Sequence, residues 1–510
     1  MNSVRKFIGA NRNFPTFNRF FGWLFSWRII RRLLITSAVA VTLVVLLYTV
    51  ELVRGKWAWN KYVAETEARG NPLDITAIIP PPVPDDENFA MIPLLRDSFD
   101  FIAPIDSSNQ LDLGPYFKAL KSVKIPIKNG NWTEGERIDL SSWQACFRAE
   151  SNPDAVEKVP TSESPQSPAE DVLLALTLRK DALDQLREGS NRQHARFPID
   201  YEANFAALLP HLAPIKGTTQ TLRLKALAHL EAGNVDLAFQ DTMLGFYLRE
   251  AIKSEPLLIC HLVRIAINTI MIHPVWEGIT DGKWNEKQLV EFQQLFEGDN
   301  WFADYKQSIL GERAFSIAAL DMIRRGDWET YSGIFGGSPD TGLTSVLIPS
   351  GWVYQNMLSI CLWEDRFLLN GVDEKKMRLD MKLVNSFESD FGKIGFSPYN
   401  IFVKMVLPAL SKAGLKAAHA QTASDRAAIA CAIERYRLAT GSLPETLEQL
   451  VPAHMASLPH DVINGDPLKY KPEGNDRYLL YSVGANQTDD GGGFDDDWVW
   501  LYRRNSEIKK

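Results

Sequence analysis

The sequence is poor in the residues that bind transition metals or build disulfide frameworks. Only four cysteines occur in 510 residues, and no two form a C-x-x-C pair. The eight histidines show no spacing typical of a zinc site. Three of the cysteines lie in apolar helical stretches, which favours buried free thiols, and a disulfide outside the cytoplasm is the alternative. The cysteines are Cys146, Cys260, Cys361 and Cys431.

Linear catalytic motifs are also missing. The chain contains no H-E-x-x-H, Walker A or dinucleotide-binding glycine pattern, and the segment 336–340 fails the G-x-S-x-G pattern. A few acids, histidines and arginines could meet within or between helices, where salt bridges and partly buried histidines are the more ordinary explanation. These candidates are Glu255, His261, Arg264, His229, Glu312 and Arg313. A non-enzymatic protein is therefore the first hypothesis, and a membrane-tethered hydrolase with a site in the helical body is the alternative.

The first fifty residues contain no acidic side chain. They carry seven arginines or lysines, so the remainder of the chain has a formal charge of −15, against −8 for the whole. So acidic a body is a poor partner for nucleic acid. The sequence also identifies no small-molecule substrate.

Residues 33–50 form an uncharged apolar run directly after Arg31 and Arg32. Its length matches the shortest helices that cross a bilayer, so we predict a transmembrane helix whose partner is the lipid bilayer. Basic residues upstream keep the N-terminus in the cytoplasm and send the rest across. A cleaved signal peptide is the alternative, because Ala38-Val39-Ala40 is a small-residue pattern, although it lies inside the apolar run.

Beyond the anchor, apolar residues recur at helical spacing over most of the chain, and glycines end several segments. We expect a mainly α protein, an irregular helical bundle followed by a small α+β domain. An aromatic and arginine-rich segment before the anchor suits the inner membrane surface. The expected parts are a basic segment at 1–32, the transmembrane helix at 33–50, a stalk and proline-rich arm at 51–110, the helical body at 111–394 and the C-terminal domain at 395–510.

The C-terminal domain begins with a long predicted helix, from about Asn400 to Thr440, which Gly441 ends. A short helix opened by Pro444 comes next. Three segments with strand-like composition complete it, at residues 468–471, 478–483 and 498–503. We expect these segments to form a three-stranded antiparallel sheet.

An acidic, glycine-rich loop joins the last two predicted strands. It holds five aspartates and the triplet Gly491–Gly493, which permits tight backbone turns. Because crowded carboxylates repel one another, a hard cation such as Ca²⁺ would relieve the repulsion, and the spacing approximates a calcium loop. The predicted ligands are Asn486, Thr488, Asp489, Asp490 and Asp497. A solvated acidic turn without an ion is the alternative.

Residues from about 425 to 502 resemble the globular part of the major pseudopilin of type II secretion systems. The matching motifs are a helix ending in ERYRLATG, the segment SLPETLEQLVP, the turn NGDPLKYKP and the strand end YSVGAN before the acidic loop. The residues of this chain that match positions of the family's motifs are Tyr436, Gly441, Pro444, Asp466, Pro467, Gly484, Ala485 and Asn486. Asp489, Asp490 and Asp497 match positions in the family's calcium loop.

The resemblance implies a calcium-stabilised fold, envelope or secretion-machine partners and a bacterial inner-membrane location with the bulk of the chain in the periplasm. The chain lacks the family's prepilin-peptidase site and early membrane-helix glutamate, so pilus assembly is not implied. Residues 56–330 resemble uncharacterised membrane-anchored bacterial proteins, which indicates no activity.

Overall fold

A computed structural model describes residues 27–96, 127–149, 159–327, 348–474 and 476–503. The chain forms two compact units, one from the residues up to 65 with 320–358, the other from 66–319 with 359–510. The mainly α class is confirmed, as are the long apolar N-terminal helix and the small antiparallel sheet near the C-terminus. Most of the predicted interfacial segment before the anchor lies outside the described residues, as do residues 336–340.

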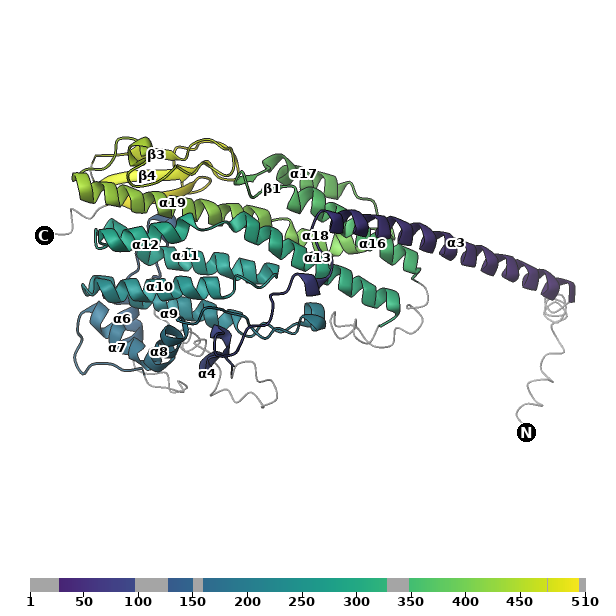
Figure 1. Ribbon diagram of the computed structural model, residues 1–510, viewed down its shortest axis with the longest axis horizontal. Helices are drawn as coiled ribbons and strands as arrows, with labels where there is room; N and C mark the ends of the chain where they lie inside the picture. Colours follow the sequence, from purple (N-terminus) through teal and green to yellow (C-terminus); the bar gives the residue numbers. More distant parts are fainter. Residues whose placement is uncertain (1–26, 97–126, 150–158, 328–347, 475, 504–510) are drawn as a thin grey trace, which may run out of the picture. The chain divides into compact units, whose positions relative to one another are not determined.

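The N-terminal helix α3 runs without a break from Trp27 to Ala68 (Figure 1). It contains the whole predicted membrane span, most of whose large apolar side chains are more than half exposed. Eighteen residues of helix extend about 27 Å, close to the thickness of a bilayer's hydrocarbon core. Among the described helices, α3 and α11 (Leu258–Thr280) are long and apolar enough to cross a membrane, but the apolar window of α11 is 61% buried, as in a core helix.

In the first unit, α3 meets the start of α16 (Ser350–Trp363) at two glycines. A Cβ on Gly55 would lie 2.5 Å from the carbonyl oxygen of Gly351, and a Cβ on Gly351 would lie 2.3 Å from the carbonyl oxygen of Glu51. The two backbones therefore touch, and only glycine allows this approach. The contact lies within about one and a half helical turns of the end of the apolar run.

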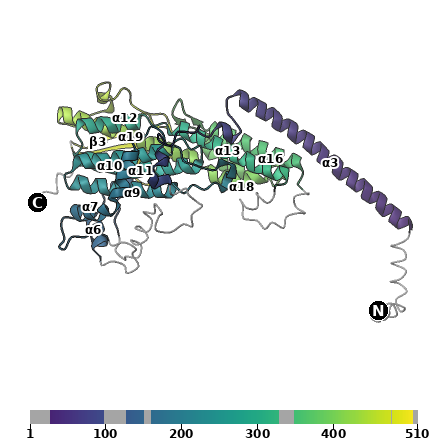
Figure 2. The same cartoon turned by 60° about the horizontal axis from the view of Figure 1, so that its bottom comes forward.

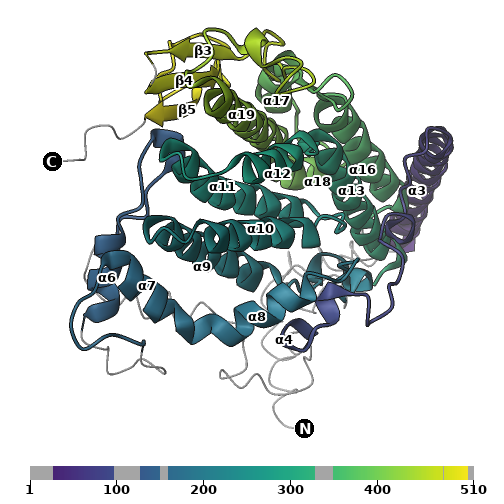
Figure 3. The same ribbon diagram turned by 60° about the vertical axis from the view of Figure 1, so that its left-hand side comes forward.

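The second unit is a layered helical body. The helix α9 packs on α10 and α11, and α19 packs on α11 and α12, while α6 and α7 cover α9 (Figures 2 and 3). The remaining helices are short or lie at the edges of these layers. The bounds are α4 Pro93–Arg96, α6 Leu140–Arg148, α7 Pro168–Leu176, α8 Lys180–Gly189, α9 Leu212–Glu231, α10 Val235–Ala251, α12 Glu286–Glu297, α13 Trp301–Arg325, α17 Met381–Gly392, α18 Ile401–Leu410 and α19 Ala413–Thr440.

The three predicted strands are confirmed. They are β3 (Lys469–Pro472), β4 (Arg477–Ser482) and β5 (Trp498–Arg503), antiparallel in the order β3-β4-β5. The sheet lies along α19 (Figure 3). Tyr478, Leu480, Trp500 and Tyr502 belong to the same hydrophobic core as Phe292 of α12. The sheet and the helical layers thus share one core.

Three expectations about local structure are wrong. The helix predicted from Asn400 to Thr440 is two helices, α18 and α19, separated at 411–412. The segment after Pro444 forms only a 3₁₀ turn, η9 (Leu447–Leu450). The proline-rich arm is predicted to be a stiff spacer between the membrane and the body, but its end lies in the core, where Phe89 and Ala90 are fully buried.

Two features of the second unit have no counterpart in the predictions. The helix α16 continues as a π-helix, η8 (Glu364–Leu369), whose first side chain is fully buried. A small hairpin of β1 (Val372–Asp373) and β2 (Arg378–Leu379) comes next. The prediction of buried thiols is confirmed: all four cysteines are buried, and none forms a disulfide within the described residues.

Candidate functional site

The acidic loop closes the β4-β5 hairpin, where Ser482 pairs with Trp498. Gly484 has φ 64°, and a Cβ there would lie 2.0 Å from the carbonyl oxygen of Asp496. Gly491 and Gly492 also have positive φ, at 80° and 89°. As expected, the glycines allow the chain to fold back on itself.

Backbone amides of the glycine run bind two of the aspartates. Asp489 Oδ1 accepts hydrogen bonds from the Gly491 amide at 3.0 Å and from the Tyr481 hydroxyl at 3.0 Å. These two bonds hold the pKa of Asp489 below its usual value, the Gly491 amide contributing most. The Gly492 amide donates to Asp497 Oδ2 at 2.7 Å. The loop's own donors therefore stabilise two of its five carboxylates.

The other predicted ligands bind one another. Asn486 Nδ2 donates to Asp490 Oδ2 at 2.7 Å, and the Thr488 amide donates to Asn486 Oδ1 at 2.8 Å. Within the described residues, no group of three or more His, Cys, Asp or Glu side chains is arranged to hold a metal ion. One observation still fits a cation: Asp497 is 4% exposed, and its Oδ1 has no hydrogen-bond partner in the described part of the chain. The donor set is all oxygen, as Ca²⁺ prefers.

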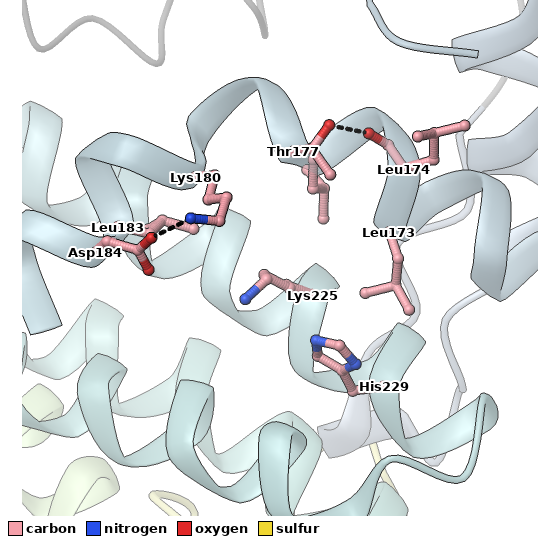
Figure 4. A pocket seen from close by; sticks show the side chains of 9 residues that line it. Leu173, Leu174, Thr177, Lys180, Leu183, Asp184, Lys225 and His229 are labelled. Atoms are coloured by element: carbon pink, nitrogen blue, oxygen red, sulfur yellow. Dashed lines mark hydrogen bonds and ion pairs between the residues drawn. The ribbon is translucent and has the colours of Figure 1, made fainter. Parts of the chain in front are cut away.

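A pocket of about 350 Å³ opens between the segment from α7 to α8 and the helix α9. This size lies at the lower end of the range for small-molecule sites, about 300–1,000 Å³. Leucines of α7 and α8 form most of its apolar wall. In Figure 4 Lys180 and Asp184 lie on one side, and Leu173 and His229 lie on the other.

The charged groups at this pocket are paired. Lys180 Nζ lies 2.8 Å from Asp184, and Lys225 Nζ lies 3.0 Å from the buried Asp241, which Arg187 also contacts at 2.8 Å. Burial lowers the pKa of His229, although the nearby charge of Asp241 opposes this shift. The pocket therefore combines an apolar wall with charged groups that are already paired within the protein.

The acids and histidines singled out in the helical body lie inside the core. Glu255 is 5% exposed, and its carboxylate lies 2.9 Å from His211 Nε2 and accepts a hydrogen bond from Cys260 Sγ at 2.8 Å. His261 is 3% exposed, and burial lowers its pKa to about 3, helped by the charge of Arg264. It packs edge-on against the ring of Trp301 instead of contacting Glu255.

The remaining candidates also have structural partners. Arg264 binds Asp304 at 2.8 Å. Glu312 accepts the Leu258 amide at 3.1 Å, and burial raises its pKa. His229 alone lines the pocket described above. No local pattern indicates the pair of His211 and Glu255, which are 44 residues apart and meet only in the folded chain.

No family model, no curated protein and no solved structure matches this chain.

Proposed function

We propose that this protein is a membrane-anchored scaffold or interaction protein, with an extracytoplasmic helical body and a calcium-stabilised, pseudopilin-like C-terminal part. The observation that carries the proposal is α3, whose uncharged apolar segment is exposed along most of its length. So long an exposed apolar surface is unfavourable in water and favourable in a bilayer. The basic residues before it orient the N-terminus toward the cytoplasm of a bacterial inner membrane.

The interior of the body supports a scaffold over the alternative hydrolase. The groups that could have formed a catalytic site are engaged with one another or with the backbone, as His211 is with Glu255 and Glu312 is with the amide of Leu258. A hydrolase needs a nucleophile or an activated water in contact with a general base. At the pocket, the Thr177 hydroxyl is occupied in donating to the Leu174 carbonyl at 2.7 Å.

The order of elements at the C-terminus supports the pseudopilin-like part. The long helix α19 ends at Gly441, a short turn follows, and three antiparallel strands carry the acidic loop between the last two. This order agrees with the resemblance in sequence. Participation in a secretion-type assembly, with envelope or secretion-machine proteins as partners, rests on that resemblance and on analogy. Co-purification with secretin or pseudopilin components would test it.

The anchor is tested by placing charges in it. We expect the double variant V44R/L47R to move the chain from the carbonate-resistant membrane fraction to the soluble fraction, because an arginine inside a span costs up to about 3 kcal/mol, most at its centre. The matched control is V53R, at an exposed position beyond the span, which should stay in the membrane. A wild-type chain shortened at about residue 40 and soluble would instead indicate a cleaved signal peptide and would refute the anchor.

The calcium site predicts a response of the full chain, because the sheet shares its core with the helices. With Ca²⁺ at a hundredfold excess over its dissociation constant, the folded state should gain about 2.7 kcal/mol. The melting temperature in detergent micelles should rise with Ca²⁺ and fall with a chelator. D497N should abolish the response, and D495N, at an exposed aspartate outside the predicted ligand set, should keep it. An unchanged melting temperature would remove calcium from the proposal and leave the anchor intact.

A further inference from the structure

The segment between α17 and the middle of α19 differs in charge from the rest of this acidic protein. After Asp390 the next acidic residue is Asp425, and the 34 residues between them contain four lysines. These are Lys393, Lys404, Lys412 and Lys416. The segment therefore has a local charge of +4 in a chain whose net charge is −8. Such a patch attracts an anionic surface.

The same segment exposes large apolar side chains. Phe396 is 85% exposed, Met405 of α18 is 60% exposed and Ile401 at the start of α18 is 36% exposed. The opposite face of α18 is buried, since Val403 and Leu407 are fully covered. The helix thus attaches to the body by one face and presents apolar side chains on another.

Most of the lysines here have no competing partner. Within the described residues no ion pair is formed by Lys404, Lys412 or Lys416, in contrast to the paired lysines at the pocket. Lys393 lies 3.4 Å from Asp390, which Arg366 also binds at 2.8 Å. The cations are therefore available to bind an external anion.

We propose that residues 393–416 form a second membrane contact, in which Phe396, Ile401 and Met405 enter the surface of an anionic bilayer and the lysines bind lipid phosphates. With ten residues, about 15 Å of helix, α18 is too short to cross a membrane and would lie in the interface. Lysine stems reach past apolar side chains to the headgroups. This inference rests on the proposed anchor, which keeps a bilayer within reach of the body.

Charge and composition favour a lipid surface over a protein partner. A protein interface is depleted in lysine and enriched in arginine and aromatic residues at its centre. Here exposed apolar side chains lie in and just before the short helix α18, and lysines lie before, within and after it, a combination that suits the interface of an anionic membrane. The anchor also favours this contact, because tethering the chain to the bilayer raises the effective concentration of the lipid surface near residues 393–416.

The test places a fluorescent probe on the full chain in liposomes. Phe396→Cys is labelled with an environment-sensitive dye, and the four native cysteines are buried and should react slowly. In liposomes with anionic phosphatidylglycerol, the emission at position 396 should shift to shorter wavelength and be quenched by lipids that carry a spin label near the headgroup. Phe494→Cys is the matched control, because Phe494 is also an exposed phenylalanine but lies in the acidic loop. The emission of a probe at position 494 should neither shift nor be quenched.

The second part of the test measures how insertion of the segment depends on its lysines and on the charge of the lipid. In the Phe396→Cys background, K404Q/K412Q should reduce the inserted population by about 25-fold, because each lysine near an anionic surface contributes about fivefold to partitioning. Neutral phosphatidylcholine or high salt should have the same effect. An unquenched probe at 396 in anionic liposomes, with a probe at Val44→Cys quenched by lipids that carry the spin label deep in the acyl chain, would refute the second contact and leave the anchor. Both probes unquenched would refute the anchor itself, and a 396 probe shielded without lipid would indicate a protein partner instead.

Discussion

Replacing Arg313 with methionine is expected to lower the free energy of unfolding by about 3–5 kcal/mol, the range for breaking a buried ion pair from one side. Arg313 and Glu364 are both 0% exposed, and Arg313 Nε donates to Glu364 Oε2 at 2.8 Å. Arg313 also binds Asp365 at 2.8 Å. Without the guanidinium, the Glu364 carboxylate would be buried with no opposing charge.

The loss of stability in R313M should depend on pH. Burial raises the pKa of Glu364 to about 7, although Arg313 opposes this rise. Removing Arg313 raises the pKa further. A carboxyl whose pKa is higher in the folded state than in the unfolded state contributes its stability at low pH and loses it as pH rises. The R313M variant should therefore be closer to the wild type at pH 5 than at pH 8, as measured by chemical unfolding of the full chain in detergent micelles.

Two controls separate the ion pair from simple loss of a large side chain. In an E364Q background the R313M substitution should cost about 2 kcal/mol less, since the buried negative charge is already gone. R366M removes a neighbouring arginine that is 58% exposed and pairs with Asp390, so it should cost less than about 1 kcal/mol. If R313M unfolded within 1 kcal/mol of the wild type at pH 8, the pair would not stabilise the fold.

Replacing Gly311 with alanine is expected to destabilise the body by about 3 kcal/mol or more, at the upper end of the cost of overpacking. Gly311 lies in the middle of α13, where a Cβ would be 1.6 Å from the carbonyl oxygen of Pro256. That oxygen belongs to the backbone just before α11, so the contact cannot be relieved by rotating a side chain. The segment before α11 would have to move away from α13.

The matched control is the same substitution at Gly392, the last residue of α17, where nothing lies within 4 Å of a Cβ. There alanine should be neutral or stabilising by up to about 1 kcal/mol, because its helix propensity is higher than that of glycine. Thermal unfolding of both variants by circular dichroism would compare them directly. Equal melting temperatures for G311A and G392A would contradict the close approach of α13 to Pro256.

The local pattern of apolar and polar residues was sufficient to predict most of the helices and strands. The apolar run at 33–50 is one exposed helical segment, and the segments near 478 and 498 are antiparallel strands as expected. The prediction failed where the composition favours helix but does not decide how far each helix extends. The composition of residues 400–440 favours helix throughout, yet the chain breaks at 411–412, shortly after Pro408. The run of residues after Pro444 is helical in composition but forms only one 3₁₀ turn.

In the acidic loop, too, the sequence predicts some features and not others. Spacing along the chain placed the aspartates of the acidic loop together, but it did not indicate which oxygens would accept backbone amides. Asp489 and Asp497 each bind a glycine amide, an outcome set by the positive φ angles at Gly491 and Gly492. Calcium binding remains a prediction, supported by the buried, unpaired oxygen of Asp497.

The sequence by itself determined the apolar anchor, the mainly helical body, the three strands and the acidic loop, because each depends on residues close together in the chain. Only the tertiary structure decided which charges are buried and with what partner. His211 meets Glu255, and Arg313 meets Glu364, across 44 and 51 residues. Desolvation makes such pairs strongly coupled, and it depends on how whole helices pack, which no short stretch of sequence records.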